Sequence, residues 1–173
     1  MAGLSTRPFR TGNGRLISRI ILTCLLLSTI GASPVVQNQR SLCLANEETL
    51  FACPIASKQV AVCHDGRLAI YRFGRRDAVE LEIKSGRFAR AGYSGGGESQ
   101  IQFEKRGYSY VIFDRTVRTE FGTDGQNAAD TSAGVLIRRD GQKVGTRFCG
   151  GSGEQTIAGK SAKLLPKGTF FAH

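Results

Sequence analysis

The sequence predicts an all-β domain, a small antiparallel barrel or sandwich of about eight strands, between an amino-terminal signal segment and a flexible carboxy-terminal tail. Three observations predict this class. Apolar and polar residues alternate over much of the chain after residue 47, glycine is abundant at 22 of 173 residues, and tryptophan is absent while methionine occurs once. Many short strands joined by turns have such a composition, whereas long helices do not.

We divide the chain into a signal segment over residues 1–32, a linker over 33–46, a β domain over 47–149 and a flexible tail over 150–173. The first segment has the features of a secretory signal, because Arg7, Arg10, Arg15 and Arg19 precede an apolar run over residues 20–30. That run is shorter than the roughly 20 residues that a spanning helix needs, so an uncleaved anchor is the weaker alternative. Cleavage after Ala32 or Ala45 would leave an exported protein, periplasmic or secreted, with no membrane span.

Export changes the interpretation of the cysteines, because thiols tend to pair in an oxidising compartment. Cys24 leaves with the signal, and cleavage near Ala32 leaves Cys43, Cys53, Cys63 and Cys149. Four cysteines allow three complete pairings, and the sequence alone does not rank them.

The strand pattern is clearest over residues 79–84, where apolar residues alternate with charged ones as in a half-buried strand. Further strands are predicted over residues 49–53, 59–63, 68–73, 100–104 and 108–113, and the last is aromatic and β-branched enough to be central. Gly107 marks the turn before it. Asp140-Gly141 separates residues 134–139 from 142–149, which predicts a hairpin with a type I′ turn.

Three segments stand outside the strand pattern. Residues 94–97 read Ser-Gly-Gly-Gly before a strand, and residues 122–132 form a polar insertion that we expect to be a mobile loop. The tail begins with Gly-Gly-Ser-Gly and continues with scattered lysines, which predicts poor order apart from docking by Phe170-Phe171.

No group of residues has the pattern of an active site, so we expect a protein that is not an enzyme and binds no metal and no cofactor. His64 directly follows Cys63, and strand neighbours point to opposite faces, so we interpret His64 as a surface turn residue. The cysteines lack the Cys-x-x-Cys spacing typical of zinc sites. An envelope-polymer hydrolase, the enzyme alternative, would depend on Glu98, Glu104 or Asp114.

The net charge of the chain does not indicate a particular class of binding partner. Of the 24 lysines and arginines, 20 follow the signal segment, against 14 acidic residues, which leaves a net charge of +6. A charge of this size serves solubility as readily as binding, and no run of five like charges occurs. Arg72, Arg75 and Arg76 cluster beside Tyr71, but for an exported protein we expect no nucleic-acid partner.

Five motifs together resemble a group of small exported bacterial proteins with no assigned activity. They are ETLFAC at residues 48–53, VAVC at 60–63, YRFG at 71–74, SGGG at 94–97 and GYSYVIF at 107–113. The resemblance covers roughly residues 47–149 and implies a compartment rather than a function.

More distantly, the layout is similar to that of the bacterial inhibitors of c-type lysozyme, which are small antiparallel barrels. This similarity implies a disulfide between Cys53 and Cys149, with Cys53 and Cys63 across the first hairpin as the alternative pairing. It also implicates in binding the small-residue loop and a basic residue after the aromatic strand, namely Ser94, Gly95, Gly96, Gly97, Glu98, Ser99 and Arg115. The inhibitors' Ser-Gly-x-x-Tyr loop is not reproduced, and Cys63 has no counterpart in them.

We therefore predict a non-enzymatic exported envelope protein with a binding surface formed by the loops at residues 95–100 and 122–132. The expected partner is an envelope or wall-associated macromolecule, or lysozyme in the inhibitor-like version. The alternatives are the hydrolase above and a structural or stress-related envelope protein without a ligand. The sequence does not predict an oligomeric state.

Overall fold

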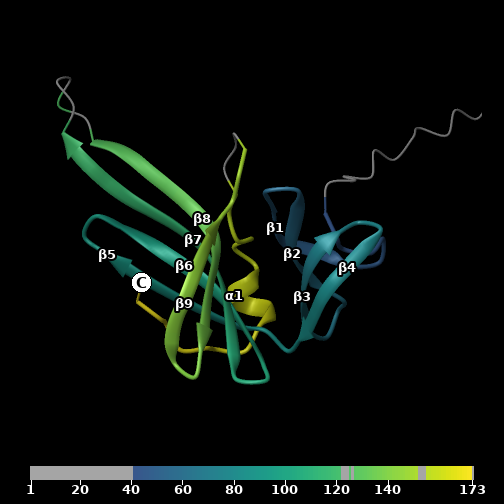
Figure 1. Cartoon of the computed structure of the whole chain (residues 1–173). Helices are drawn as coiled ribbons and strands as arrows, with labels where there is room; N and C mark the ends of the chain where they lie inside the picture. The colour runs from purple at the N-terminus through teal and green to yellow at the C-terminus, as the bar shows by residue number, and fades with distance from the viewer. Residues whose placement is uncertain (1–40, 122–124, 126, 152–154, 173) are drawn as a thin grey trace, which may run out of the picture. The chain divides into compact units, whose positions relative to one another are not determined.

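The structure is a computed structural model that describes residues 41–121, 125, 127–151 and 155–172 (Figure 1). The predicted signal segment and most of the predicted linker lie outside these residues. The described chain is all-β, with nine antiparallel strands in two sheets, and its one helix, α1 (Ser161–Leu164), is a single turn. The predicted fold class is therefore confirmed in its sandwich-like form.

The first sheet is a four-stranded meander in the order β1-β2-β3-β4. Its strands correspond to the four predicted from residue 49 to residue 84, and they are β1 (Glu48–Ile55), β2 (Lys58–His64), β3 (Ala69–Arg75) and β4 (Ala78–Lys84). In β4, Ile83 is buried while its neighbours Glu82 and Lys84 are exposed, as expected for a half-buried strand.

The second sheet follows as a five-stranded meander in the order β5-β6-β7-β8-β9. Its strands are β5 (Arg87–Tyr93), β6 (Gly96–Lys105), β7 (Tyr108–Phe121), β8 (Asn127–Arg139) and β9 (Gln142–Phe148). β7 is central, as predicted, and the positive φ angles of Asp140 (47°) and Gly141 (81°) confirm the type I′ turn between β8 and β9. The sequence pattern missed β5, whose alanines, arginines and glycine have low strand propensity.

The two sheets pack face to face through one hydrophobic core. Side chains from both inner faces form it, including Leu50, Val62 and Tyr71 from the first sheet and Ile101, Phe103 and Ile112 from the second. Such interdigitation of inner faces is the usual core of a β-sandwich.

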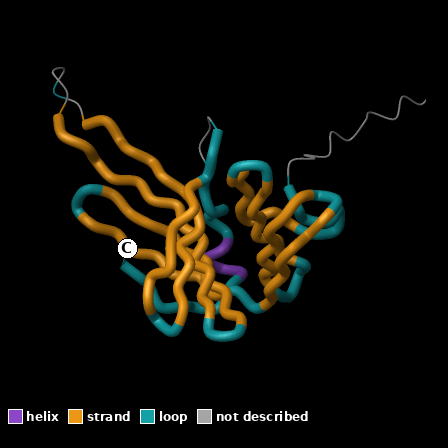
Figure 2. The backbone as a smooth tube through the Cα atoms, in the orientation of Figure 1, coloured by secondary structure: helices purple, strands orange, loops and turns teal. Residues whose placement is uncertain are grey.

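The prediction of a flexible tail is wrong for residues 155–172. Ile157 and Leu165 are buried in the core between the sheets, and Figure 2 shows α1 lying between the two groups of strands. Beyond the helix, the Phe88 N–H donates to Pro166 O (2.8 Å) and the Gly168 N–H donates to Phe88 O (2.7 Å), so the tail pairs with the edge of β5. Phe171 then packs against buried residues on the outer face of the second sheet.

The predicted linker boundary is also too late, because Leu42 is buried and Cys43 forms a disulfide. Cys43 bonds to Cys63, and Cys53 bonds to Cys149, as the similarity to the inhibitors implied. The alternative pairing of Cys53 with Cys63 is wrong. In the register of β1 and β2, Cys53 lies opposite Val60 while Cys63 lies opposite Thr49, so the two cysteines do not face each other.

Residues 127–132, predicted as part of a mobile loop, belong to β8 instead. β7 and β8 have 14 and 13 residues, whereas the strands of the first sheet have seven or eight. At about 3.3 Å per residue, the difference leaves about 20 Å of the long strands without a facing sheet. Figure 1 shows β7 and β8 running out beyond their neighbours. We call this part of the second sheet, β7 from residue 114 and β8 up to residue 133, the overhang.

Candidate functional site: a cleft at the base of the overhang

A cleft of about 660 Å³ lies on the second sheet where the overhang begins. All five strands of that sheet contribute to its lining, together with residues between 149 and 159, whereas no residue of the first sheet does. A volume of this size is typical of ligand sites. The cleft exists because the first sheet is too short to cover this part of the second.

The floor of the cleft is made of small and hydroxyl-bearing residues. Because side chains alternate along a strand, Gly97 and Ser99 of β6 lie on the same face as the core residue Ile101. Thr116 on β7 and Thr131 on β8 pair with one another and continue this floor. At the core end of these strands the inward-facing side chains are large and apolar. At the cleft the inward-facing residues include glycine, serine and threonine, which leave space and offer hydroxyl groups.

Two acidic side chains of the lining are already satisfied. Asp114 accepts hydrogen bonds from the main-chain N–H groups of Ser99 (3.1 Å) and Ile157 (2.6 Å), and it thereby ties the carboxy-terminal wall to the floor. Glu98 is buried and accepts a hydrogen bond from Gln100 Nε2 (2.7 Å). Both carboxylates therefore hold the protein's own groups.

Two arginines of the lining have no such partners. The side chains of Arg90 and Arg115 form no hydrogen bond or ion pair with any described residue, and Arg115 Nε is buried without a partner. Arg90 pairs with Ser99 and so lies on the face of the cleft floor, whereas Arg115 pairs with Glu98 on the opposite face. With Asp114 already bonded, Arg90 therefore offers positive charge to a ligand in the cleft.

Five of the seven predicted binding residues line this cleft: Gly96, Gly97, Glu98, Ser99 and Arg115. They do so as strand residues, with Glu98 directly opposite Arg115, and not as a loop. Only Ser94 and Gly95 form the turn between β5 and β6. Gly96 has a structural reason to be glycine, since its φ is +150° and a Cβ there would lie 1.9 Å from Thr116 O.

Sequence reasoning missed the residues that complete the cleft. Gln155, Thr156 and Ile157 come from the tail that was predicted to be flexible, and Arg90 comes from the unrecognised strand β5. The buried Ile157 is an apolar signal, but a single isoleucine among small and polar residues does not identify a packed segment.

His64 does not line the cleft. It is the last residue of β2 in the first sheet and it is buried, so its interpretation as a surface turn residue is wrong. Its Nδ1 accepts a hydrogen bond from the Gly66 N–H (3.2 Å), which stabilises the turn that follows.

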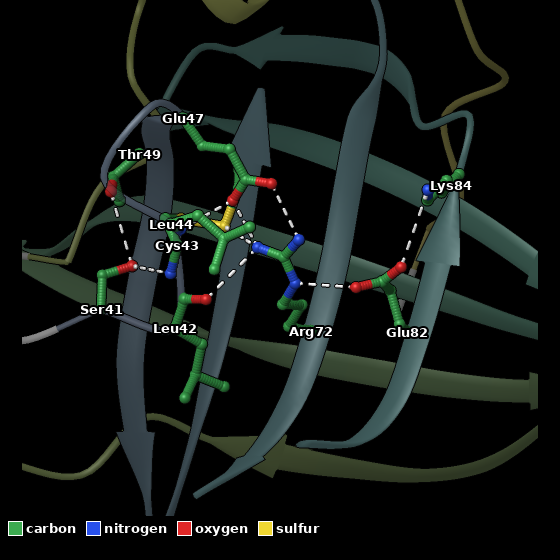
Figure 3. A network of polar contacts seen from close by, with 10 residues as sticks. Ser41, Leu42, Cys43, Leu44, Glu47, Thr49, Arg72, Glu82 and Lys84 are labelled. Carbon is green, nitrogen blue, oxygen red and sulfur yellow. Dashed lines mark hydrogen bonds and ion pairs between the residues drawn. A yellow bond between two sulfur atoms is a disulfide. The ribbon is translucent and has the colours of Figure 1, made fainter. Parts of the chain in front are cut away.

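A second polar cluster lies on the outer face of the first sheet (Figure 3). The Arg72 guanidinium donates to both carboxylate oxygens of Glu47, to Glu82 Oε2 (2.9 Å) and to Leu42 O (3.3 Å). The side chains of Arg72 and Glu47 are only 7% and 3% exposed. Arg72 is thus unavailable to a nucleic acid, and the cluster fixes the chain that leads into β1.

Charge pairing dominates the electrostatics of this cluster. The hydrogen bond with Arg72 lowers the pKa of Glu47, and the same bond raises the pKa of Arg72 despite its burial. Cys43 and Cys63 lie beside Glu47, but their sulfurs are bonded to each other and offer no thiolate to a metal.

The fold and the cleft together define a two-sheet, disulfide-linked all-β domain. Two disulfides are typical of an oxidising, extracytoplasmic compartment, and within the described residues no helix is long and apolar enough to cross a membrane. The chain matches no family model, and no curated protein or solved structure matches it significantly. The resemblances stated above therefore stay predictions.

Proposed function

We propose that this protein is a non-enzymatic exported envelope protein, periplasmic or secreted, that binds a macromolecular partner in the cleft at the base of the overhang. The observation that carries the proposal is the preformed cleft itself, with its small polar floor and Arg90, whose side chain has no partner among the described residues. The disulfides and the signal-like amino terminus support export.

The acidic residues favour binding over hydrolysis. Alternation along β6 places Glu98 on the opposite face from Ser99, and Asp114 accepts two main-chain hydrogen bonds that anchor the wall. Glu104 is exposed at the other end of β6 and does not line the cleft. Glycoside hydrolysis requires two carboxylates that face one substrate. The positions of these acidic residues do not favour such a pair.

The test fills the cleft with one substitution. A Cβ added at Gly92, which lines the cleft, meets nothing within 4 Å, and its φ is not positive, so Gly92→Leu occupies the cleft without backbone strain. Gly145 in β9 is equally open and lies outside the cleft, so Gly145→Leu is the matched control. In a pull-down, beads that carry the oxidised, mature protein should retain an envelope partner. We expect beads with Gly145→Leu to retain the same partner and beads with Gly92→Leu to lose it. Equal retention by both variants, or no retained partner, would contradict the proposal.

Lysozyme inhibition is the second candidate, and the Cys53–Cys149 disulfide favours it because the similarity to the inhibitors implied that bond. The segment offered to the lysozyme would be the Ser94-Gly95 turn. A lysozyme turbidity assay with wild type and Gly95→Leu tests this version, since a Cβ at Gly95 also meets nothing within 4 Å. Inhibition by wild type that Gly95→Leu abolishes would support it, and absence of inhibition at micromolar concentration would exclude it.

A further inference from the structure

Along the overhang, the outer edge of β8 pairs with no strand in the part of the chain that the structure describes. β9 pairs with β8 only between Arg139 and Gly134, and the last bond between them is from the Cys149 N–H to Ala133 O (2.9 Å). Cys149 then bonds to Cys53, and the Gly150 N–H donates to Pro54 O (2.8 Å), so the chain turns to the first sheet. No described residue occupies the position that β9 would take beside residues 129–132, and we call this position the open lane.

The main-chain groups that face the open lane follow from the strand geometry. β7 and β8 pair without a register shift from Arg118↔Ala129 to Tyr108↔Arg139, so β8 is regular over this length. Ala133 O faces β9, and alternation therefore turns the N–H and C=O groups of Ala129 and Thr131 to the same side. No described residue pairs with these groups in the open lane.

Among residues 41–121, 125, 127–151 and 155–172, nothing gives this edge the usual protection against strand addition. Natural edges are blunted by lysines, prolines, bulges or a covering segment. Here Ala128, Ala129, Thr131 and Ser132 are small, Asp130 is the one charged residue among them, and all are exposed or half-buried.

The open lane also adjoins the cleft. Thr131, Ser132 and Ala133 line the cleft from β8, and Phe148, Cys149 and Gly151 line it from the departing chain. A strand added in the lane would direct alternate side chains over the cleft floor. The unpaired Arg90 on the floor face of the lining, together with a net charge of +6 after the signal segment, favours acidic side chains there.

We propose that the partner contributes an extended polypeptide segment bearing acidic side chains, which pairs with Ala129 and Thr131 as an added strand beside β8. In this recognition mode main-chain hydrogen bonds supply affinity, and a pocket for alternate side chains supplies selectivity. The inference rests on the proposed function, because it assigns a partner class to the same cleft.

The probe is a labelled octapeptide of alternating threonine and glutamate with blocked ends, and fluorescence anisotropy at low salt measures its binding to the oxidised, mature protein. We expect it to bind at least tenfold more tightly than a threonine–lysine octapeptide. We also expect an analogue methylated at every backbone nitrogen to lose binding. Absence of binding at millimolar peptide, or equal binding of the methylated analogue, would overturn the proposal.

Two variants locate the binding. Ala129→Pro removes an N–H that faces the open lane, and proline is tolerated at such edge positions, so its unfolding midpoint should match that of wild type while affinity falls at least tenfold. Arg90→Gln, at an exposed residue of the lining, should reduce the preference for glutamate over lysine several-fold. Unchanged peptide affinity in both variants would overturn the assignment of the site.

Two further outcomes separate this inference from its basis. If an envelope partner is lost by Gly92→Leu but kept by Ala129→Pro, the proposed function stands and the added strand is wrong. Sedimentation tests whether a second copy of the chain fills the open lane. A dimer that is absent in Ala129→Pro and that persists when the octapeptide is added would show this, and the proposed partner class would then be wrong.

Discussion

The ion pair of Arg72 and Glu47 is the most deeply buried charged contact of the first sheet. Burial of two charges costs desolvation, which their attraction repays only with good geometry, and here both oxygens of Glu47 accept from the guanidinium. The pair connects the segment before β1 to β3. Removal of one partner would leave a buried charge without compensation.

We predict that Glu47→Gln lowers the free energy of unfolding by about 3 kcal/mol at pH 7. Because the fold lowers the pKa of Glu47, its stabilisation is complete above the ordinary value of 4.5 and is lost as pH falls through the folded pKa. Urea unfolding at pH 7, 5 and 3 should show wild type converging on the variant. Glu80→Gln, in the exposed pair with Lys58, is the control and should cost less than about 1 kcal/mol. Parallel pH curves for wild type and Glu47→Gln would refute the assignment.

Single residues also explain why the candidate site was only partly predictable. The glycines of residues 94–97 stand out in any sequence, and three of the predicted cleft residues are there or adjacent: Gly96, Gly97 and Glu98. These residues were expected in a loop but belong to strand β6, where a Cβ at Gly96 would clash with the backbone of Thr116 in β7. Arg90 carries no local sequence signal, because its role depends on which strand lies beside it.

Among the elements, those with at least one buried face were predictable and those without one were not. Residues 79–84 alternate because one side of the strand packs on the core. Residues 108–113 are aromatic and β-branched because both faces are covered, with Ile112 in the core between the sheets and Val111 and Phe113 buried on the outer face. The overhanging half of β8 has no covered inner face, so its side chains are small and polar on both sides, and the sequence looks like a loop. The overhanging half of β8 is a strand because it pairs with β7. The sequence of that segment alone does not reveal this pairing.

The tail offers a prediction at this scale. Ile157 is 6% exposed within the core, so Ile157→Ala should lower the free energy of unfolding by about 2–5 kcal/mol. Leu164, 38% exposed on α1, is the matched control, and its replacement by alanine should cost less than about 1 kcal/mol. Equal urea midpoints for the two variants would mean that the tail does not pack in solution as it does here.

For the whole molecule, the two disulfides constrain very different lengths of chain. Cys53–Cys149 closes a separation of 96 residues and joins the two sheets, whereas Cys43–Cys63 closes 20 residues beside the first sheet. A disulfide lowers the entropy of the unfolded chain, and this effect is larger for the longer loop. The integrity of the sandwich should therefore depend more on the long-range bond.

We predict that replacing Cys53 and Cys149 by alanine lowers the free energy of unfolding by about 4–5 kcal/mol, and that replacing Cys43 and Cys63 lowers it by about 3 kcal/mol. Urea unfolding of the two double variants under oxidising conditions measures both values. A larger loss from the short loop would refute the ranking, and an unfolding midpoint of wild type that reductant does not change would refute the contribution of both bonds.

The position of Cys149 has a consequence for the order in which the molecule is assembled. If the chain is exported as proposed and enters amino terminus first, Cys43, Cys53 and Cys63 reach the oxidising compartment before Cys149. Cys43 and Cys63 can then bond to each other beside the first sheet, whereas the native partner of Cys53 arrives only after the last strand. In that order, the bond that joins the two sheets is the final covalent step of assembly.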